Sequence, residues 1–311
     1  MGDVGRLYSE LAASWLWLAA LGGVILWMRQ RHALKTLSAA HTTRRRHATL
    51  GLALSLGLLF FSATGLTWSQ WAGGNIAELR NVWGWNTPSA STALTDTDDQ
   101  APDEHAEHHR HMAMVSSTIT LEDFDRALSA AQAAGLTASR LQLSPPASEN
   151  QAWRVAEIDR RWPTQVDQVA LHPHSMAVTD QTDFATFPLA AKLTRWGIDL
   201  HMGVLFGLVN QVVLALIAAG LVTLMGWGYA MAWRRLRTAS GQRFPTVSEP
   251  WLLLPIQAKL SVLLVAIALG LALPVLGVSL ALFIVIDALR WYVKKRYTAR
   301  HLNAHPSNTS R

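Results

Sequence analysis

The sequence contains no cysteine among its 311 residues. Disulfide bonds, thiolate-bound iron–sulfur clusters and haem attached through thioether bonds are therefore excluded. Charged residues are also scarce, at 15% of the chain, whereas 50% of the residues are hydrophobic. This balance departs from that of soluble globular proteins and favours an integral membrane protein. Any bound metal or haem iron would have to be held by His, Met or carboxylate side chains.

Acidic residues are absent between Met28 and His47, a stretch that contains six Arg and Lys residues. By contrast, 16 of the 21 acidic residues lie between Trp71 and Arg195. Because basic loops beside membrane spans mark the cytoplasmic side, we expect the acidic middle of the chain to face outward. The formal net charge of +6 then reflects membrane topology, and no nucleic-acid partner is expected.

Three apolar segments are long enough to cross a bilayer, namely residues 8–28, 47–71 and 200–233. A further apolar run, residues 251–291, is interrupted by Gly270, Pro274 and Gly277. It is too long for one crossing and fits two short ones joined in a tight hairpin. The sequence thus predicts about five spans in a bacterial inner membrane, with the amino end periplasmic and the carboxyl end cytoplasmic. Asp287, inside this hairpin, is expected to pair with Arg290 near the interface.

The polar middle of the chain ends in a small predicted domain. After Thr120, the segment "LEDFDRALSAAQAAG" has apolar residues at helical spacing and a stop at Gly135. The segments "SRLQLS", "AWRVAEID" and "DQVALHP" that follow alternate like strands, and "HPHSM" (172–176) is expected to be a turn that closes the fold. One helix packed on a small antiparallel sheet is the simplest arrangement that buries both apolar faces.

The predicted fold is an integral membrane α-helical bundle with a small periplasmic α+β domain. Its expected parts are two transmembrane helices with a basic cytoplasmic loop (1–71), a periplasmic linker (72–114), the α+β domain (115–193), a third transmembrane helix (194–240) and a transmembrane hairpin with a cytoplasmic tail (241–311).

The linker contains a run of potential metal ligands, "DEHAEHHRHMAM". Imidazoles suit copper, zinc, nickel or iron, and thioethers add a preference for cuprous copper. A solvated polar linker is the alternative, because such a segment is not preorganised for binding. If functional, it would collect or sense metal outside the membrane. The candidate ligands are His105, His108, His109, His111, Met112 and Met114.

The sequence resembles the PepSY-associated transmembrane proteins, a family that includes iron-regulated membrane proteins and siderophore reductases. The resemblance rests on "RRRHATLGLALSLGLLFFSATGLTWS", on "HPHSMAVTDQTDFATFPLAAKLTRW" and on "DLHMGVLFGLVNQ", in this order. It implies a helix bundle that holds haem b through histidines at helix ends and passes electrons outward to ferric iron, often in a siderophore. By the motif match, His47 and His201 are the implied axial ligands. The outer domain would be PepSY-like.

The predicted topology puts His47 and His201 at opposite membrane faces, separated by about 30 Å, so they would serve two different haems. Each would need a partner. In the family pattern the partners come from helices earlier in the chain, and we expect that this sequence lacks them together with the first span and first PepSY domain. Other candidate sources are a homodimer, or inner-loop residues that pair with His47, namely His32, His41 and His301. A solvated position at lipid headgroups remains the alternative for both His47 and His201.

Two glycines beside His201 have two interpretations. Gly203 and Gly207 could let a flat ring approach the backbone, or they could form a face on which helices pack closely.

The leading functional hypothesis is a ferric-iron or ferric-siderophore reductase without a catalytic acid or base. No dinucleotide-binding or phosphate-loop pattern occurs, so the electron donor would be quinol or a separate cytoplasmic reductase. Two alternatives stay open. One is a membrane-anchored binding or regulatory module without haem, and the other is a carboxyl-terminal fragment of a longer reductase that is inactive alone.

Overall fold

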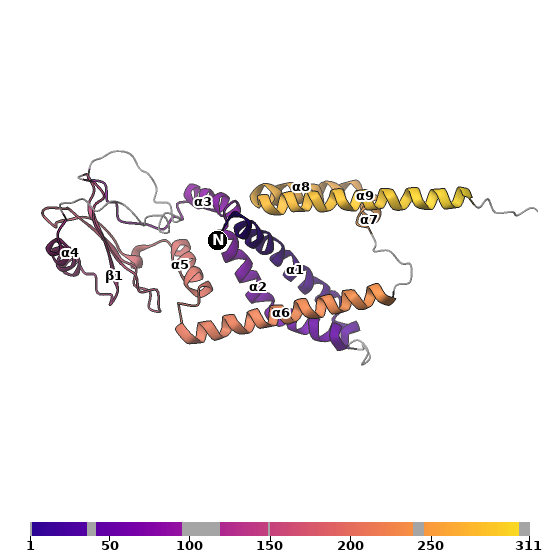
Figure 1. Cartoon of the computed structure of the whole chain (residues 1–311), viewed down its shortest axis with the longest axis horizontal. Coiled ribbons are helices and arrows are strands. Elements are labelled where there is room, and N and C mark those ends of the chain that lie inside the picture. The colour runs from indigo at the N-terminus through magenta and orange to yellow at the C-terminus, as the bar shows by residue number, and fades with distance from the viewer. Residues whose placement is uncertain (1, 36–41, 95–118, 149, 239–245, 305–311) are drawn as a thin grey trace, which may run out of the picture. The chain divides into compact units, whose positions relative to one another are not determined.

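A computed structural model describes residues 2–35, 42–94, 119–148, 150–238 and 246–304 (Figure 1). The chain divides into two compact units, one formed by residues 1–79 and 216–311 and the other by residues 80–215. Among the described residues, four helical segments are long and apolar enough to cross a membrane: Asp3–Arg31, Thr42–Thr67, Gly207–Arg237 and Pro274–Arg296. A shorter apolar helix, Ile256–Ala272, occupies the place of the fifth predicted span.

Helices α1 (Asp3–Lys35) and α2 (Thr42–Thr67) pack along each other in the first unit. The Ser62 hydroxyl on α2 donates a 2.6 Å hydrogen bond to the Ala13 carbonyl on α1, which satisfies a polar group inside an apolar interface. The carboxyl-terminal part of helix α6 (Gly207–Thr238) packs on α2. A Cβ atom at Gly220 would lie 2.6 Å from Leu54 Cδ1, so the two helices approach closely because this position has no side chain.

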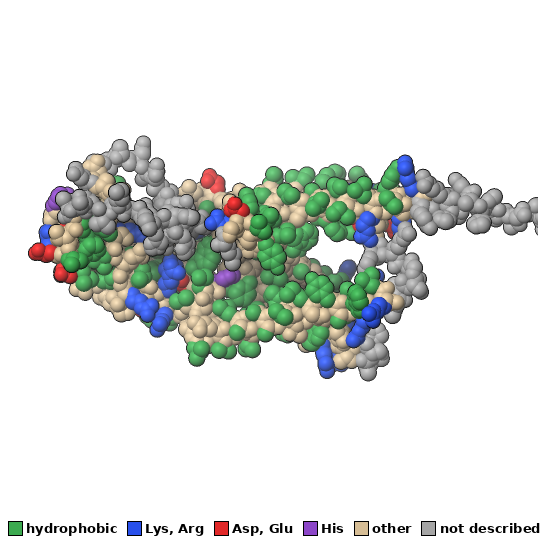
Figure 2. All heavy atoms as spheres, in the orientation of Figure 1, with side chains coloured by type: hydrophobic (Ala, Val, Ile, Leu, Met, Phe, Trp, Pro, Cys, Tyr) green, Lys and Arg blue, Asp and Glu red, His purple; other side chains and the backbone are tan. Residues whose placement is uncertain are grey.

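Helices α8 (Ile256–Ala272) and α9 (Pro274–Ala304) form the predicted hairpin and lie side by side in Figure 1. Their backbones meet at two glycines, because a Cβ at Gly277 would lie 2.8 Å from Gly270 Cα. Hydrophobic side chains cover much of the visible surface of α8 and α9, as Figure 2 shows. Such a surface is expected where helices face lipid rather than water.

A carboxylate on α1 and an amide on α3 cap the ends of other helices in this unit. Glu10 of α1 accepts hydrogen bonds from the backbone N–H groups of Trp71 (3.1 Å) and Ala72 (2.9 Å), at the start of helix α3 (Ala72–Val82). Asn75 of α3 donates through Nδ2 to the carbonyls of Leu271 and Ala272, both at 3.0 Å, at the end of α8. Helix α3 therefore connects α1 to the hairpin through polar contacts at helix ends.

The predicted pairing of Asp287 with Arg290 is present as an electrostatic attraction, but it is not the main contact of the carboxylate. Asp287 of α9 instead accepts hydrogen bonds from Val247 N, at 3.2 Å, and from the N–H and hydroxyl groups of Ser248, at 2.9 and 2.8 Å. These groups form the amino end of helix α7 (Ser248–Leu253). The carboxylate satisfies donors that an isolated helix end leaves unpaired, which explains a buried acid at this position.

The second unit contains a four-stranded antiparallel sheet in the order β1-β2-β3-β4. The strands are β1 (Leu141–Ser144), β2 (Trp153–Glu157), β3 (Gln168–Leu171) and β4 (Val178–Thr182). The first three confirm the sequence prediction, and "HPHSM" forms the predicted turn before β4, with Met176 at φ 56°. Strand β4 was not predicted because its sequence, "VTDQT", is polar and lies at the edge of the sheet.

Helix α4 (Leu121–Ala133) is the helix predicted after Thr120. Its amino end is fixed by Asp123, whose carboxylate accepts from the Thr120 N–H and hydroxyl groups at 3.0 and 2.8 Å. Its apolar face packs on the sheet, where Phe124 contacts the fully buried Trp153 edge to face with ring centroids 4.9 Å apart. This helix and sheet form one hydrophobic core.

Two predicted boundaries need correction. The expected linker 72–114 begins with helix α3, and its residues Ala90–Leu94 lie against the sheet through an Ala93–Gln151 bridge. The expected single helix 194–240 is two helices, α5 (Leu189–His201) and α6. The chain breaks at residues 202–206 because Gly203 and Gly207 adopt positive φ angles of 76° and 57°, which disfavour a continuous helix.

Candidate cofactor site

His47 lies on the second turn of α2, within the first unit, and its side chain is half-buried. Its Nδ1 atom is buried and has no hydrogen-bond partner among the residues that the structure describes. Gly228 of α6 is adjacent, because a Cβ built on this glycine would lie 3.9 Å from His47 Cε1. A buried ring nitrogen without a partner is costly, so this imidazole is suited to an additional ligand.

A groove of about 470 Å³ lies between the first turns of α2 and Trp227 of α6, and its lining includes Arg46, the residue before His47, but not His47 itself. Its lining combines apolar side chains with two arginines. An amphiphile with anionic groups and a flat apolar body would match this combination. The lining residues are Thr42, Arg45, Arg46, Thr49, Leu50, Ala53 and Trp227.

His201 is the last residue of α5, in the second unit, and is also half-buried. Burial lowers the pKa of its imidazole below the ordinary value of 6.5. The neutral ring, which is the form that ligates metals, is therefore favoured. The break after His201 is stabilised by Asn210, whose Nδ2 donates to the Leu200 carbonyl at 2.9 Å. Gly203 and Gly207 act as turn residues here and do not form one face of a continuous helix.

A buried ionic cluster lies two residues before His201 and was missed in the sequence. Asp199 is fully buried, and its carboxylate contacts Arg195 Nε at 3.3 Å and Arg160 Nε at 3.9 Å. Burial raises the pKa of Asp199, and the two guanidinium groups oppose that rise. Arg160 comes from the β2–β3 loop, so the cluster ties the sheet to α5. The only sequence signal was the spacing of Arg195 and Asp199, which places them one helical turn apart.

Aromatic side chains gather around the same part of the second unit. The ring centroid of Trp162 lies 5.5 Å from that of Trp196 and 6.3 Å from that of Phe206, and Trp196 lies 5.9 Å from Phe184. Trp162 N also donates to the Leu205 carbonyl at 2.9 Å. The turn after His201 is therefore held by the loop of the sheet as well as by α5.

The remaining predicted ligands fall into two groups. His32 and His301 were expected in loops, but their backbones belong to helices α1 and α9, which corrects that expectation. His41 and the complete His/Met segment lie outside the described residues: His105, His108, His109, His111, Met112 and Met114. Within the described ranges, no cluster of three or more His, Asp and Glu side chains has the geometry of a metal site. His47 and His201 belong to different units.

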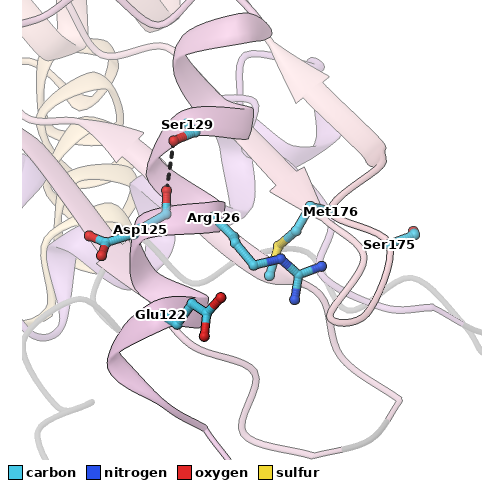
Figure 3. A pocket seen from close by; sticks show the side chains of 6 residues that line it. All are labelled: Glu122, Asp125, Arg126, Ser129, Ser175 and Met176. Carbon is cyan, nitrogen blue, oxygen red and sulfur yellow. Dashed lines mark hydrogen bonds between the residues drawn. The ribbon is translucent and has the colours of Figure 1, made fainter.

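A second pocket, of about 390 Å³, lies on the α+β domain between α4 and the β3–β4 turn (Figure 3). Arg126 extends from α4 toward Met176, and its guanidinium donates to the His174 carbonyl at 2.8 Å. The pocket thus offers carboxylates, a guanidinium, hydroxyls and a thioether to a polar ligand. Its lining residues are Glu122, Asp125, Arg126, Ser129, Ser175 and Met176.

Comparison with known proteins identifies one family. The family model described as the PepSY-associated TM region matches residues 1–235. This match confirms the resemblance deduced from the three sequence motifs. No curated protein and no solved structure matches the chain.

Proposed function

The chain belongs to the PepSY-associated transmembrane family, and on that premise we propose that it transfers electrons across a bacterial inner membrane to ferric iron or a ferric siderophore in the periplasm. Ferrous iron is a poorer match than ferric iron for the hard oxygen ligands of a siderophore, so reduction releases it. The periplasmic side is the one that carries the PepSY-like domain. Quinol or a separate cytoplasmic reductase is the proposed donor.

The observation that carries this proposal is the environment of His47. Its half-buried imidazole has a buried Nδ1 without a hydrogen-bond partner among the described residues, and the same end of α2 lines a groove with Arg45, Arg46 and apolar side chains. Haem b, when bound, supplies a one-electron couple that needs no acid or base from the protein. His47 would ligate it, and Arg45 and Arg46 would neutralise its carboxylates.

His201 contributes a second potential ligand in the other unit. Its lowered pKa keeps the imidazole neutral and able to donate an electron pair to a metal. The positive-φ glycine that follows ends α5 at this residue, so no further helical turn extends past the ring. Each histidine provides one ligand, and a partner subunit in a homodimer is the proposed source of the others.

The test is a reduced-minus-oxidised visible spectrum of the full chain, expressed with ample haem and purified in nanodiscs. We expect a b-type signal that His47→Ala and His201→Ala each diminish. The control is His174→Ala, which removes an exposed imidazole from the β3–β4 turn and should leave the signal unchanged. A wild-type chain without any haem signal would refute the proposal.

One observation favours a second function, a membrane-anchored binding module without haem. The pocket beside α4 is built by the soluble domain alone and contains both acidic and basic side chains. A chain that lacks haem but binds a charged peptide, with loss of binding in Arg126→Ala, would support this second candidate. A haem signal at His47 and His201 would instead support the first.

A further inference from the structure

The loop between β2 and β3 reaches the start of helix α6. Trp162 N donates to the Leu205 carbonyl at 2.9 Å, and Arg160 Nε lies 3.9 Å from Asp199 Oδ1. One contact fixes the loop to the turn before α6, and the other fixes it to α5. The tip of the loop therefore keeps a constant position relative to the first residue of the membrane span that begins at Gly207.

Three large apolar side chains are exposed at this point. Trp162, Met202 and Phe206 have exposed fractions of 56%, 58% and 52%, and we call them the tryptophan patch. The ring centroids of Trp162 and Phe206 are 6.3 Å apart, so the patch brings together residues from the loop and the turn. An apolar cluster of this kind on a domain surface indicates an interaction site.

The patch is continuous with a surface that faces hydrocarbon. Leu208 and Val209, in the first turn of α6, are 75% and 69% exposed and belong to an apolar span. Phe206 is two residues before Leu208, and Met202 lies at the other end of the same turn. The first turn of α6 and the tryptophan patch therefore share one environment. For a helix that spans a membrane, this environment is lipid.

Charge at the loop tip matches the headgroup region. Arg161 is exposed beside Trp162, whereas Arg160 contacts Asp199 and Asp159 accepts a hydrogen bond from the Arg161 N–H group. Tryptophan favours the boundary between hydrocarbon and water, and an arginine beside it can contact lipid phosphates. We propose that the tryptophan patch and Arg161 dock the α+β domain on the surface of the phospholipid bilayer where α6 enters it.

The absence of cysteine makes a direct test simple, because one introduced cysteine is the only labelling site. We would attach an environment-sensitive fluorophore to Trp162→Cys in the full chain and reconstitute it in nanodiscs that contain phosphatidylglycerol and headgroup-proximal nitroxide lipids. The matched control is Leu121→Cys, which labels an 86% exposed position on α4 of the same domain. We expect blue-shifted, strongly quenched emission at 162 and aqueous, unquenched emission at 121.

A second arm tests the charge. In a chain labelled at Phe206→Cys, Arg161→Gln should lower the ratio of docked to undocked domain by about fivefold in phosphatidylglycerol. The same substitution should have little effect in phosphatidylcholine alone. Hydrogen exchange of α4 would verify that each variant remains folded. Equal emission from positions 162 and 121, with the spectrum of a probe in water, would overturn the proposal if the chain is folded. A blue shift at position 162 that occurs only when a partner protein is added would overturn it as well. The readout needs no haem and is therefore independent of the proposed reductase activity.

Discussion

Glu10 is expected to hold helix α3 in place, and Glu10→Ala tests this directly. The carboxylate is 1% exposed and accepts hydrogen bonds from the N–H groups of Trp71 and Ala72. Trp71 is 39% exposed, so its N–H group can be hydrated once the carboxylate is removed. Ala72 is fully buried and its N–H group cannot reach water without movement of the helix. The substitution therefore leaves one buried donor unpaired.

The magnitude follows from these two bonds. A hydrogen bond to a charged group contributes about 1.5–3 kcal/mol, and a buried unpaired donor costs about 1–3 kcal/mol. The two values partly describe the same contact and cannot simply be added. We therefore expect Glu10→Ala to destabilise α3 locally by about 2–4 kcal/mol. Since 1.36 kcal/mol corresponds to a tenfold change, the opening equilibrium of α3 should rise by roughly 30- to 1,000-fold.

Hydrogen exchange measured by mass spectrometry on the full chain in nanodiscs reports this opening, because amides of α3 exchange through local unfolding. Glu78→Ala is the matched control, since it removes the same charge from an exposed position on α3 itself. Glu10→Gln keeps one acceptor oxygen and should give an intermediate effect. Unchanged exchange of α3 in Glu10→Ala, with faster exchange in Glu78→Ala, would show that the cap contributes nothing and that the reasoning is wrong.

Three further predictions concern other parts of the chain. Asp287→Ala should accelerate hydrogen exchange of α7 by tenfold or more, because it removes three hydrogen bonds of about 1 kcal/mol or more each. The control Glu249→Gln removes only an exposed ion pair and should change the exchange of α7 little. Equal effects of the two substitutions would contradict the proposed capping by Asp287. Burial, together with the neighbouring carboxylates, raises the pKa of Asp167 above 3.8 in the folded chain. As the pH rises, the unfolded chain therefore loses this proton before the folded chain does. The free energy of unfolding should fall between pH 3.8 and the higher pKa of the folded state. Asp167→Asn should flatten that slope in thermal unfolding of the full chain, and an unchanged slope would refute the assignment. Gly203→Ala should destabilise the chain more than Gly207→Ala. A positive φ costs an alanine about 1–2 kcal/mol at either position, but only at Gly203 would the added Cβ contact side chains, at 3.1 and 3.3 Å. Calorimetry that ranks the two variants in the opposite order would exclude this explanation.

The spacing of apolar residues was sufficient to predict the helices and strands that face lipid or water on one side and one apolar core on the other. The apolar runs identified the membrane helices, and the spacing in "LEDFDRALSAAQAAG" identified α4 with its Thr120 cap and Gly135 stop. Strands β1 to β3 followed from alternation. These features depend on local composition, which a sequence displays directly.

The features that were missed depend on contacts between distant residues. The carboxylates of Glu10 and Asp287 cap helices 61 and 39 residues away or more, and no local pattern encodes such a partner. Likewise, Asp199 looked like one acid in an amphipathic helix until the β2–β3 loop brought Arg160 to it. At the candidate site, the motifs identified His47 and His201, but the burial of His47 Nδ1 and the groove between α2 and α6 depend on how these helices pack.

The capping contacts of α3 also have a consequence for the order of biosynthesis. The bonds from Glu10 join residues 61 and 62 positions apart, so they can form as soon as the first two spans are made. The bond from Asn75 to Leu271 spans 196 residues. At the usual 5–20 residues per second, the ribosome needs about 10–40 s to synthesise that interval. During this time the first turn of α3 is already held by Glu10, while the Asn75 side chain still lacks its partners on α8. The last hairpin can therefore bind to a helix that was in place before the hairpin was synthesised.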